Sequence, residues 1–110
     1  MPRGDLLGSL EYIVLLALVR LEENAYGMTV RREIEGRTGR SISIGAIYAT
    51  LERLQAKGYV RSFVGEPTAE RGGRAKRLFR IEADGRRALG TTQEAMQKMA
   101  AGLKKQWGTT

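Results

Sequence analysis

Apolar side chains recur at helical spacing over most of the chain, and they divide it into four expected helices and two short strands. The first helix is expected to run from Ser9, as its N-cap, to about Glu23, and it is apolar on almost every side. Such a helix is buried on more than one face, either by its own domain alone or by its domain together with a second subunit. The second helix is expected to begin near Gly27 and to end at Gly39, a natural left-handed cap.

The third expected helix has one apolar face. Ser43 is its N-cap, and its apolar residues recur at intervals that place them on one side of the helix: Ile44, Ile47, Tyr48, Leu51 and Leu54. Two β-prone segments follow at 59–64 and 76–82, and the loop between them is too long for a tight hairpin and too basic for a core. This order predicts an α+β, mainly α, fold: a winged helix-turn-helix.

A last helix is expected from about Asp84 toward the end of the chain. Its apolar residues are separated by steps of seven, three, four and four, the spacing of a two-helix interface: Leu89, Met96, Met99, Leu103 and Trp107. This stripe packs either on a second copy or on its own domain. We expect residues 1–82 to form the winged helix-turn-helix domain and residues 83–110 to form a dimerisation helix, with Leu10 and Val14 of the first helix also in the interface.

The composition excludes several classes of protein. The 110 residues contain no cysteine and no histidine, which removes disulfides, the usual zinc sites and histidine-dependent catalytic triads. Neither a phosphate-binding glycine pattern nor a pair of carboxylates in an apolar setting is present, so we expect no enzyme, no cofactor and no metal. The longest apolar run has eight residues, and the N-terminus does not resemble a signal peptide, so we expect a cytoplasmic protein.

The positive charge is concentrated in the second half of the chain. The net charge is +7; residues 1–40 are neutral, whereas residues 41–82 carry eight basic and four acidic side chains. The segment 71–80 contains five basic residues and no acidic one. A polyanion is the natural partner of such a distribution, and with this fold the polyanion is double-stranded DNA. The alternative is a basic surface that serves only solubility.

The face of the third helix opposite its apolar face is the one that DNA would meet. It is expected to carry Gly45, Ala46, Ala49, Thr50 and Arg53. The small residues let the helix approach base edges, Thr50 adds a hydroxyl, and Arg53 reaches a guanine or, more naturally, a phosphate. Direct reading of bases is therefore sparse, and DNA shape is expected to contribute to specificity.

Backbone contacts are expected around the helix starts and in the wing. Ser41 and Ser43 stand at the start of the third helix, where free amides and hydroxyls suit a phosphate, although Ser43 also serves as a simple cap. Further candidates are Tyr48, which is otherwise a core residue, and two residues at the start of the second helix, Tyr26 and Thr29. The wing would contribute Arg71, Arg74, Lys76 and Arg77 around two glycines that allow a close approach to DNA.

These residues together resemble the PadR family of bacterial transcriptional regulators, over roughly residues 6–90. The likeness rests on five segments, with Leu51 and Leu54 between the third and the fourth: Leu7-Gly8-Ser9-Leu10-Glu11, Ala25-Tyr26-Gly27, Ile44-Gly45-Ala46-Ile47-Tyr48, Gly58-Tyr59-Val60, and Glu70-Arg71-Gly72-Gly73-Arg74-Ala75-Lys76-Arg77. The length is similar to that of the compact members, which have one short C-terminal helix. Where the family often has a threonine-proline pair before that helix, this chain has Glu82-Ala83.

The resemblance implies a nucleoid-associated homodimeric repressor whose last helix, with help from the first, forms the interface. It also implies release by a small molecule in some members. Some compact members hold flat hydrophobic ligands between subunits with a tryptophan of the last helix, so Trp107 is a candidate ligand residue or, alternatively, a packing residue. A non-specific architectural DNA binder and a protein-interaction adaptor are the alternative functions, and the basic wing argues against the adaptor.

Overall fold

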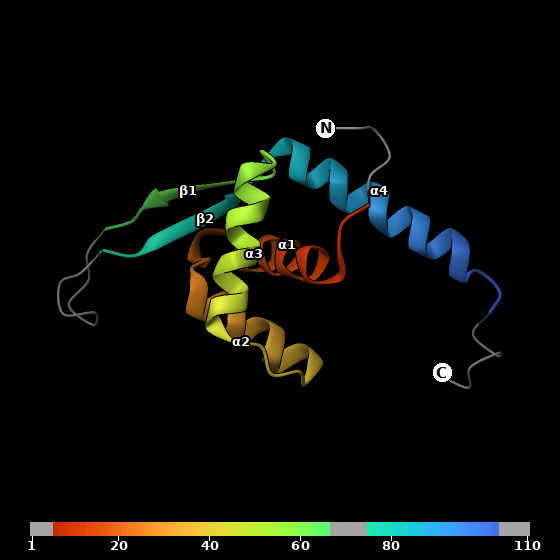
Figure 1. Ribbon diagram of the computed structural model, residues 1–110, viewed down its shortest axis with the longest axis horizontal. Coiled ribbons are helices and arrows are strands. Elements are labelled where there is room, and N and C mark those ends of the chain that lie inside the picture. Colours follow the sequence, from red (N-terminus) through yellow and green to blue (C-terminus); the bar gives the residue numbers. More distant parts are fainter. Residues whose placement is uncertain (1–5, 67–74, 104–110) are drawn as a thin grey trace.

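The structure is a computed structural model that describes residues 6–66 and 75–103, shown in Figure 1. Its elements, in chain order, are α1 (Ser9–Leu21), the short 3₁₀ helix η1 (Glu22–Asn24), α2 (Gly27–Thr38), α3 (Ile44–Ala56), β1 (Val60–Val64), β2 (Arg77–Ile81) and α4 (Ala83–Ala100). The expected order of helices and strands and the expected winged helix-turn-helix are confirmed.

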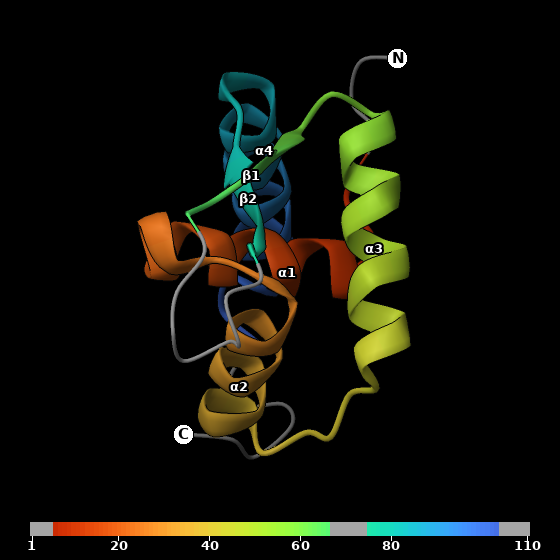
Figure 2. The same ribbon diagram turned by 90° about the vertical axis from the view of Figure 1, so that its left-hand side faces the viewer.

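The core is built around α1, which lies between the other elements (Figures 1 and 2). Helices α2, α3 and α4 and strand β2 all contact α1. Fully buried side chains from these elements form one apolar cluster, which includes Leu15, Val30, Ile47, Leu51 and Phe79. Because Ile47, Leu51 and Leu54 bury one side of α3 in this cluster, the opposite side of α3 is left for a partner. Figure 2 shows α3 at the edge of the molecule.

The two strands form an antiparallel pair in which Val60 lies opposite Ile81 and Val64 opposite Arg77. The backbone N–H of Phe79 also donates to the carbonyl of Ala25, 2.8 Å away, so the segment after η1 flanks β2. The strands extend away from the helices on the side opposite α4 (Figure 1). This arrangement places the base of the hairpin next to α3.

Helix α4 divides into a packed half and a projecting half. Gly85, Leu89 and Thr92 are buried, and the Thr92 hydroxyl accepts a hydrogen bond from the backbone N–H of Leu7, 3.1 Å away. Beyond Thr92 no residue of the described part of α4 is buried. The projecting half of α4 and the hairpin extend on opposite sides of the molecule, which measures 52 × 32 × 21 Å (Figure 1). Within the described ranges, no helix combines the length and apolar character that crossing a bilayer requires.

The helix ends mostly follow the sequence, with one difference at the start of α1. Gly39 adopts φ 72° and closes α2, and the Ser43 hydroxyl accepts from the N–H of Ala46, 3.1 Å away. The expectation for Ser9 is wrong: Gly8 is the N-cap, and the Glu11 carboxylate accepts its N–H at 2.9 Å. The Glu11 carboxylate, in the first turn of α1, thus reaches back to the N-cap backbone as the glutamate of a capping box does.

Candidate nucleic-acid interface

The outer side of α3 begins as an almost bare surface. Gly45 and Ala49 are exposed and Ala46 is half-buried. Nothing lies within 4 Å of the position that a Cβ on Gly45 would occupy. Small side chains on an uncovered helix allow another surface to approach the backbone closely, and a helix of this width fits the major groove of DNA. The structure therefore places all three of these predicted residues on one accessible side.

The turn before α3 is held by a carboxylate. Glu35 of α2 accepts the backbone N–H of Ile42, 3.1 Å away, and the guanidinium of Arg31. The bond from Ile42, and next the bond from Arg31, hold the pKa of Glu35 below its ordinary value. Ser41 also contributes, least of the groups near it, to the lowering of the pKa of Glu35, whereas Ser43 caps α3. Since a carboxylate repels a phosphate, Ser43 is the better placed of the two serines for a backbone contact.

Two tyrosines lie at the start of α2. Tyr48 of α3 is 37 % exposed, and its phenol passes so close to Gly27 that a Cβ there would come within 2.5 Å of the ring. Tyr26 is half-buried, and the Lys76 ammonium lies 4.4 Å from the centre of its ring. The structure thus brings the predicted residues Tyr26, Tyr48 and Lys76 to one place, although they come from three different elements. An aromatic and cationic cluster at the edge of α3 suits a phosphate backbone.

Two predicted contact residues are buried, and their assignment is wrong. Thr50 has no exposed surface, and its hydroxyl donates to the carbonyl of Ala46, 2.8 Å away. Thr29 is also buried; its hydroxyl accepts the N–H of Tyr26 and donates to the carbonyl of Asn24. Both threonines satisfy local backbone groups, as such side chains commonly do at helix starts and within helices. Neither hydroxyl is available to DNA.

The sequence predicts that the Thr50 hydroxyl contacts bases, whereas its burial predicts that it does not. In Thr50→Val, the shape of the side chain is kept and only a satisfied hydroxyl is lost. We expect the base preference of the protein to stay unchanged and the free energy of unfolding to fall by about 1 kcal/mol. Parallel selections of bound duplexes with both proteins, and chemical denaturation, would measure the two effects. Loss of preference at one base pair would show that Thr50 reaches DNA after all.

Arg53 remains the cation of this helix face. Its side chain is 56 % exposed, and its guanidinium donates to the Thr50 hydroxyl at 3.2 Å. Behind it, the Glu11 carboxylate is buried and accepts the Lys57 ammonium at 2.8 Å. Glu11 therefore holds the last turns of α3 against the start of α1. The sequence pattern does not indicate this role of Glu11, because the two paired residues lie 46 positions apart.

Arg77 is occupied by protein groups. Its guanidinium donates to the Glu52 carboxylate at 2.8 Å and to the side-chain oxygen of Gln55 at 3.1 Å, and it lies over the Phe79 ring. The bond and charge of Arg77 hold the pKa of Glu52 below its ordinary value. Arg77 thus links β2 to α3 rather than standing free for a phosphate. Glu52, an acceptor on the exposed side of α3, was not among the predicted site residues. Because it follows Ala49 by three residues, helical spacing places both on the same exposed side, and this spacing could have identified it.

The predicted wing and dimer residues divide between described and undescribed parts of the chain. Arg71, Arg74 and Trp107 lie outside the described residues. Val14 is completely buried and Leu89 is 9 % exposed, so the expectation that they contact a second subunit is wrong; both belong to the core of their own domain. Leu10 is half-buried on the same core. The exposed large apolar side chains on α1 and near the end of α4 are Leu16, Met96, Met99 and Leu103.

Leu16 was missed because α1 is apolar on nearly every side. In such a helix, periodicity does not identify the side that its own domain leaves uncovered. Leu16 borders an apolar groove of about 200 Å³ between α1 and α2, together with Ile13 and Ile34.

Among the residues that the structure describes, no three acidic side chains lie close enough to hold a metal ion.

The sequence matches a known protein family over most of its length. Residues 15–91 match the transcriptional regulator PadR-like family. An uncharacterised protein of Lysinibacillus sphaericus is 33 % identical over 92 residues, which cover 81 % of this chain and 80 % of that protein.

Solved structures share the fold at lower sequence identity. A PadR-like transcriptional regulator of Bacillus cereus superposes with a TM-score of 0.74 at 18 % identity and covers 92 % of this chain and 93 % of its own. A PadR family transcription regulator of Clostridium difficile gives 0.72 at 15 %, covering 93 % and 100 %. F93 of STIV, a winged-helix DNA-binding protein, gives 0.69 at 19 %, covering 89 % and 98 %.

Proposed function

This chain belongs to the PadR-like family of transcriptional regulators, and from that membership we propose that it is a sequence-specific, DNA-binding repressor that acts as a dimer. The observation that carries the proposal is the bare, accessible side of α3 beside the cluster of Tyr26, Tyr48 and Lys76. Gly45 and Ala49 let α3 enter the major groove, while Lys76 and Arg53 flank it with positive charge. The similarity in fold to a winged-helix DNA-binding protein supports DNA binding by this fold.

The contacts to the DNA backbone come from the rim of this surface. Ser43, with the free amides of the α3 N-terminus, accommodates one phosphate. Tyr26, Tyr48 and Lys76 approach the next part of the backbone. Arg71 and Arg74 remain proposed wing contacts, on the strength of the sequence alone. Few groups on α3 read bases directly, so DNA shape supplies part of the specificity.

The dimer is proposed from the projecting half of α4. Met96 and Met99 are 49 % and 79 % exposed there, and Leu103 follows on the same stripe. A helix half without support from its own domain is marginal in water, so a second copy that covers these side chains would stabilise it. We propose that residues 83–110 form the dimerisation helix and residues 1–82 the DNA-binding domain, with the first half of α4 packed on that domain. Leu16 replaces Val14 as the α1 residue offered to the partner.

Selection of bound duplexes from a random pool, at near-physiological salt, tests the proposed function. Enrichment of an inverted repeat is expected, because a two-fold dimer presents two α3 helices to two half-sites. Binding without enrichment would contradict specific recognition. It would favour the architectural alternative, which is consistent with the small number of α3 side chains that can contact bases. No binding to any duplex would contradict both. Release by a flat hydrophobic effector near Trp107 is a separate proposal, tested by adding such compounds to the complex.

Arg53→Ala tests the orientation of α3. Because Arg53 is exposed and its partners are also held by other bonds, we expect the fold to persist and DNA affinity to fall about tenfold, with the salt slope reduced by about one. Arg87→Ala is the matched control, since it removes the same charge from α4. Binding isotherms at several salt concentrations give both quantities. Equal losses for the two variants would indicate a general charge effect and contradict the proposed orientation.

A further inference from the structure

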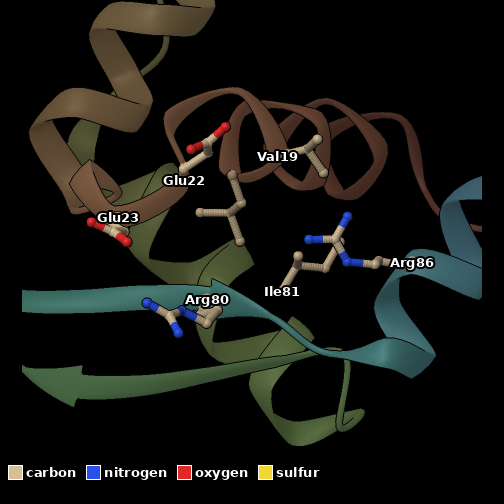
Figure 3. Close-up of a pocket in the computed structure, with 7 residues that line it drawn as sticks. Val19, Glu22, Glu23, Arg80, Ile81 and Arg86 are labelled. Atoms are coloured by element: carbon tan, nitrogen blue, oxygen red, sulfur yellow. The ribbon is translucent and has the colours of Figure 1, made fainter.

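A cleft of about 400 Å³ lies on the molecule between the end of α1, strand β2 and the start of α4 (Figure 3). Its floor is apolar: Leu18 and Ile81 are buried, and Val19 is half-buried. Its rim carries four exposed charged side chains, namely Glu22, Glu23, Arg80 and Arg86. The volume is within the range of small-molecule sites.

The charges on the rim are separated by sign. Figure 3 shows Glu22 and Glu23 on the side of α1 and η1, and Arg80 and Arg86 on the side of β2 and α4. None of the ion pairs between described residues involves any of these four side chains. Opposite charges therefore face each other across the cleft without joining, and a molecule that carries both signs could bridge them.

The surroundings of Arg80 favour an anion. Arg61 lies directly opposite Arg80 in the strand register, and both guanidinium groups lie within 6 Å of the Phe63 ring centre, at 5.8 and 5.4 Å. Like charges directly opposite on a sheet destabilise it. Arg61 is paired with Glu82, 3.3 Å away, whereas Arg80 has no carboxylate partner among the described residues. A carboxylate in the cleft would relieve this repulsion.

The acidic side of the cleft is set by an uncommon backbone conformation. Glu22 ends α1 with φ 53° and ψ −109°, and it is the only non-glycine residue with positive φ in the described part of the chain. L-residues other than glycine seldom adopt such values, and where they do, the conformation is often tied to function. Here it turns the chain sharply, so that two consecutive glutamates lie beside the cleft.

We propose that this cleft binds a small zwitterion with an apolar side chain, of which an apolar α-amino acid is the simplest kind. The carboxylate of the ligand pairs with Arg86, and Arg80, whose guanidinium lies over Phe63, adds positive charge at the rim. The ammonium group of the ligand pairs with Glu22 and Glu23, and its side chain rests on Leu18 and Ile81. Because the cleft joins the hairpin strand to α4, an occupant would link the orientation of the hairpin to that of the dimerisation helix. This regulatory consequence rests on the proposed function, whereas binding of the ligand does not.

The test is calorimetric titration of the full chain, without DNA, with L-leucine, L-methionine and L-phenylalanine up to about 10 mM, tenfold above the weakest affinity expected. At least one is expected to bind with a dissociation constant of about 1 mM or below. Arg86→Gln and the double change Glu22→Gln with Glu23→Gln are each expected to weaken binding about tenfold or more. Arg87→Gln, one position along α4 and outside the cleft, is expected to bind as the unchanged protein does.

Derivatives of the ligand test its class. N-acetylation removes the ammonium group and amidation removes the carboxylate, so both derivatives should bind about tenfold more weakly or not at all. Absence of binding by all three amino acids would overturn the proposal, and so would equal binding by the cleft variants or by the derivatives. Because the titration contains no DNA, its failure is distinguishable from a failure of the proposed DNA-binding function.

Discussion

Gly85→Ala is expected to destabilise the protein more than any exposed substitution on α4. A Cβ at Gly85 would lie 2.3 Å from the carbonyl oxygen of Tyr59 and 2.9 Å from the Ile81 side chain. The same carbonyl accepts the N–H of Glu82 at 2.8 Å, so the first turn of α4 cannot move away without losing that bond. We expect the free energy of unfolding to fall by about 3 kcal/mol. For a chain of this size, the melting temperature would fall by about 10 °C or more.

Gly90→Ala is the matched control for Gly85→Ala. Gly90 lies on the same helix and is exposed, and nothing is within 4 Å of its Cβ position. Alanine there should stabilise the protein by about 1 kcal/mol through helix propensity. Thermal melts of both variants, monitored by circular dichroism, give opposite expected signs. If Gly85→Ala melted together with the unchanged protein, the packing of α4 on the Tyr59 backbone would be wrong, and with it the position proposed for the dimerisation helix.

Glu11→Gln is the second change with a large expected effect. Burial by itself raises the pKa of Glu11, but the bonds from the Lys57 ammonium and the Gly8 N–H outweigh burial, and the pKa lies below its ordinary value. Glutamine keeps the size of the side chain and loses the charge that pairs with Lys57 and faces Arg53. We expect the free energy of unfolding at neutral pH to fall by about 2 kcal/mol, the contribution of hydrogen bonds to a charged group.

The pH dependence of this difference follows from the direction of the pKa shift. Because the pKa of Glu11 is lower in the folded protein, the unfolded chain binds the proton more readily, and acid favours unfolding. The stability difference between the unchanged protein and Glu11→Gln should therefore be complete at neutral pH and shrink as the pH falls below about 4. Urea denaturation of both proteins at a series of pH values measures it.

Glu33→Gln provides the comparison for Glu11→Gln, since Glu33 pairs with Arg37 within one helix at the surface. Its expected effect is about 0.5 kcal/mol or less. A difference for Glu11→Gln that was equally small, or that did not change with pH, would contradict the role of Glu11 as the group that holds α3 against α1. In the proposed function, this role is to set the position of α3 relative to the rest of the DNA-binding surface.

The sequence alone was sufficient to predict the helices and strands and part of the candidate site. The spacing of Ile47, Leu51 and Leu54 identified the buried side of α3, and Gly39 marked the end of α2. The bare positions Gly45 and Ala49 followed from the same periodicity. Thr50 was wrongly predicted to lie on the DNA-facing side of α3 because it is polar. It lies three residues after Ile47 and four before Leu54. That spacing places it beside the buried side, where its hydroxyl bonds the carbonyl of Ala46.

Contacts between distant segments could not be obtained in this way. The pairing of Glu11 with Lys57, and of Glu52 with Arg77, joins residues far apart in the chain, and charged side chains show no periodicity that names their partners. The burial of Val14 and Leu89, and the exposure of Leu16, depend on which elements cover each side of α1 and α4. The cleft between Glu22 and Arg86 exists only because α1, η1, β2 and α4 meet there.

What the sequence determined by itself is the set of local structures: helix periods, caps, the two strands and a strongly basic second half, all of which depend on residues within a few positions of one another. What only the tertiary structure decided is which of those surfaces are free. A side chain is available to DNA, to a second subunit or to a small molecule only if no other element covers it. That condition is set by packing between elements far apart in the chain. The spacing of apolar residues within one helix or strand therefore does not show which of its sides another element covers.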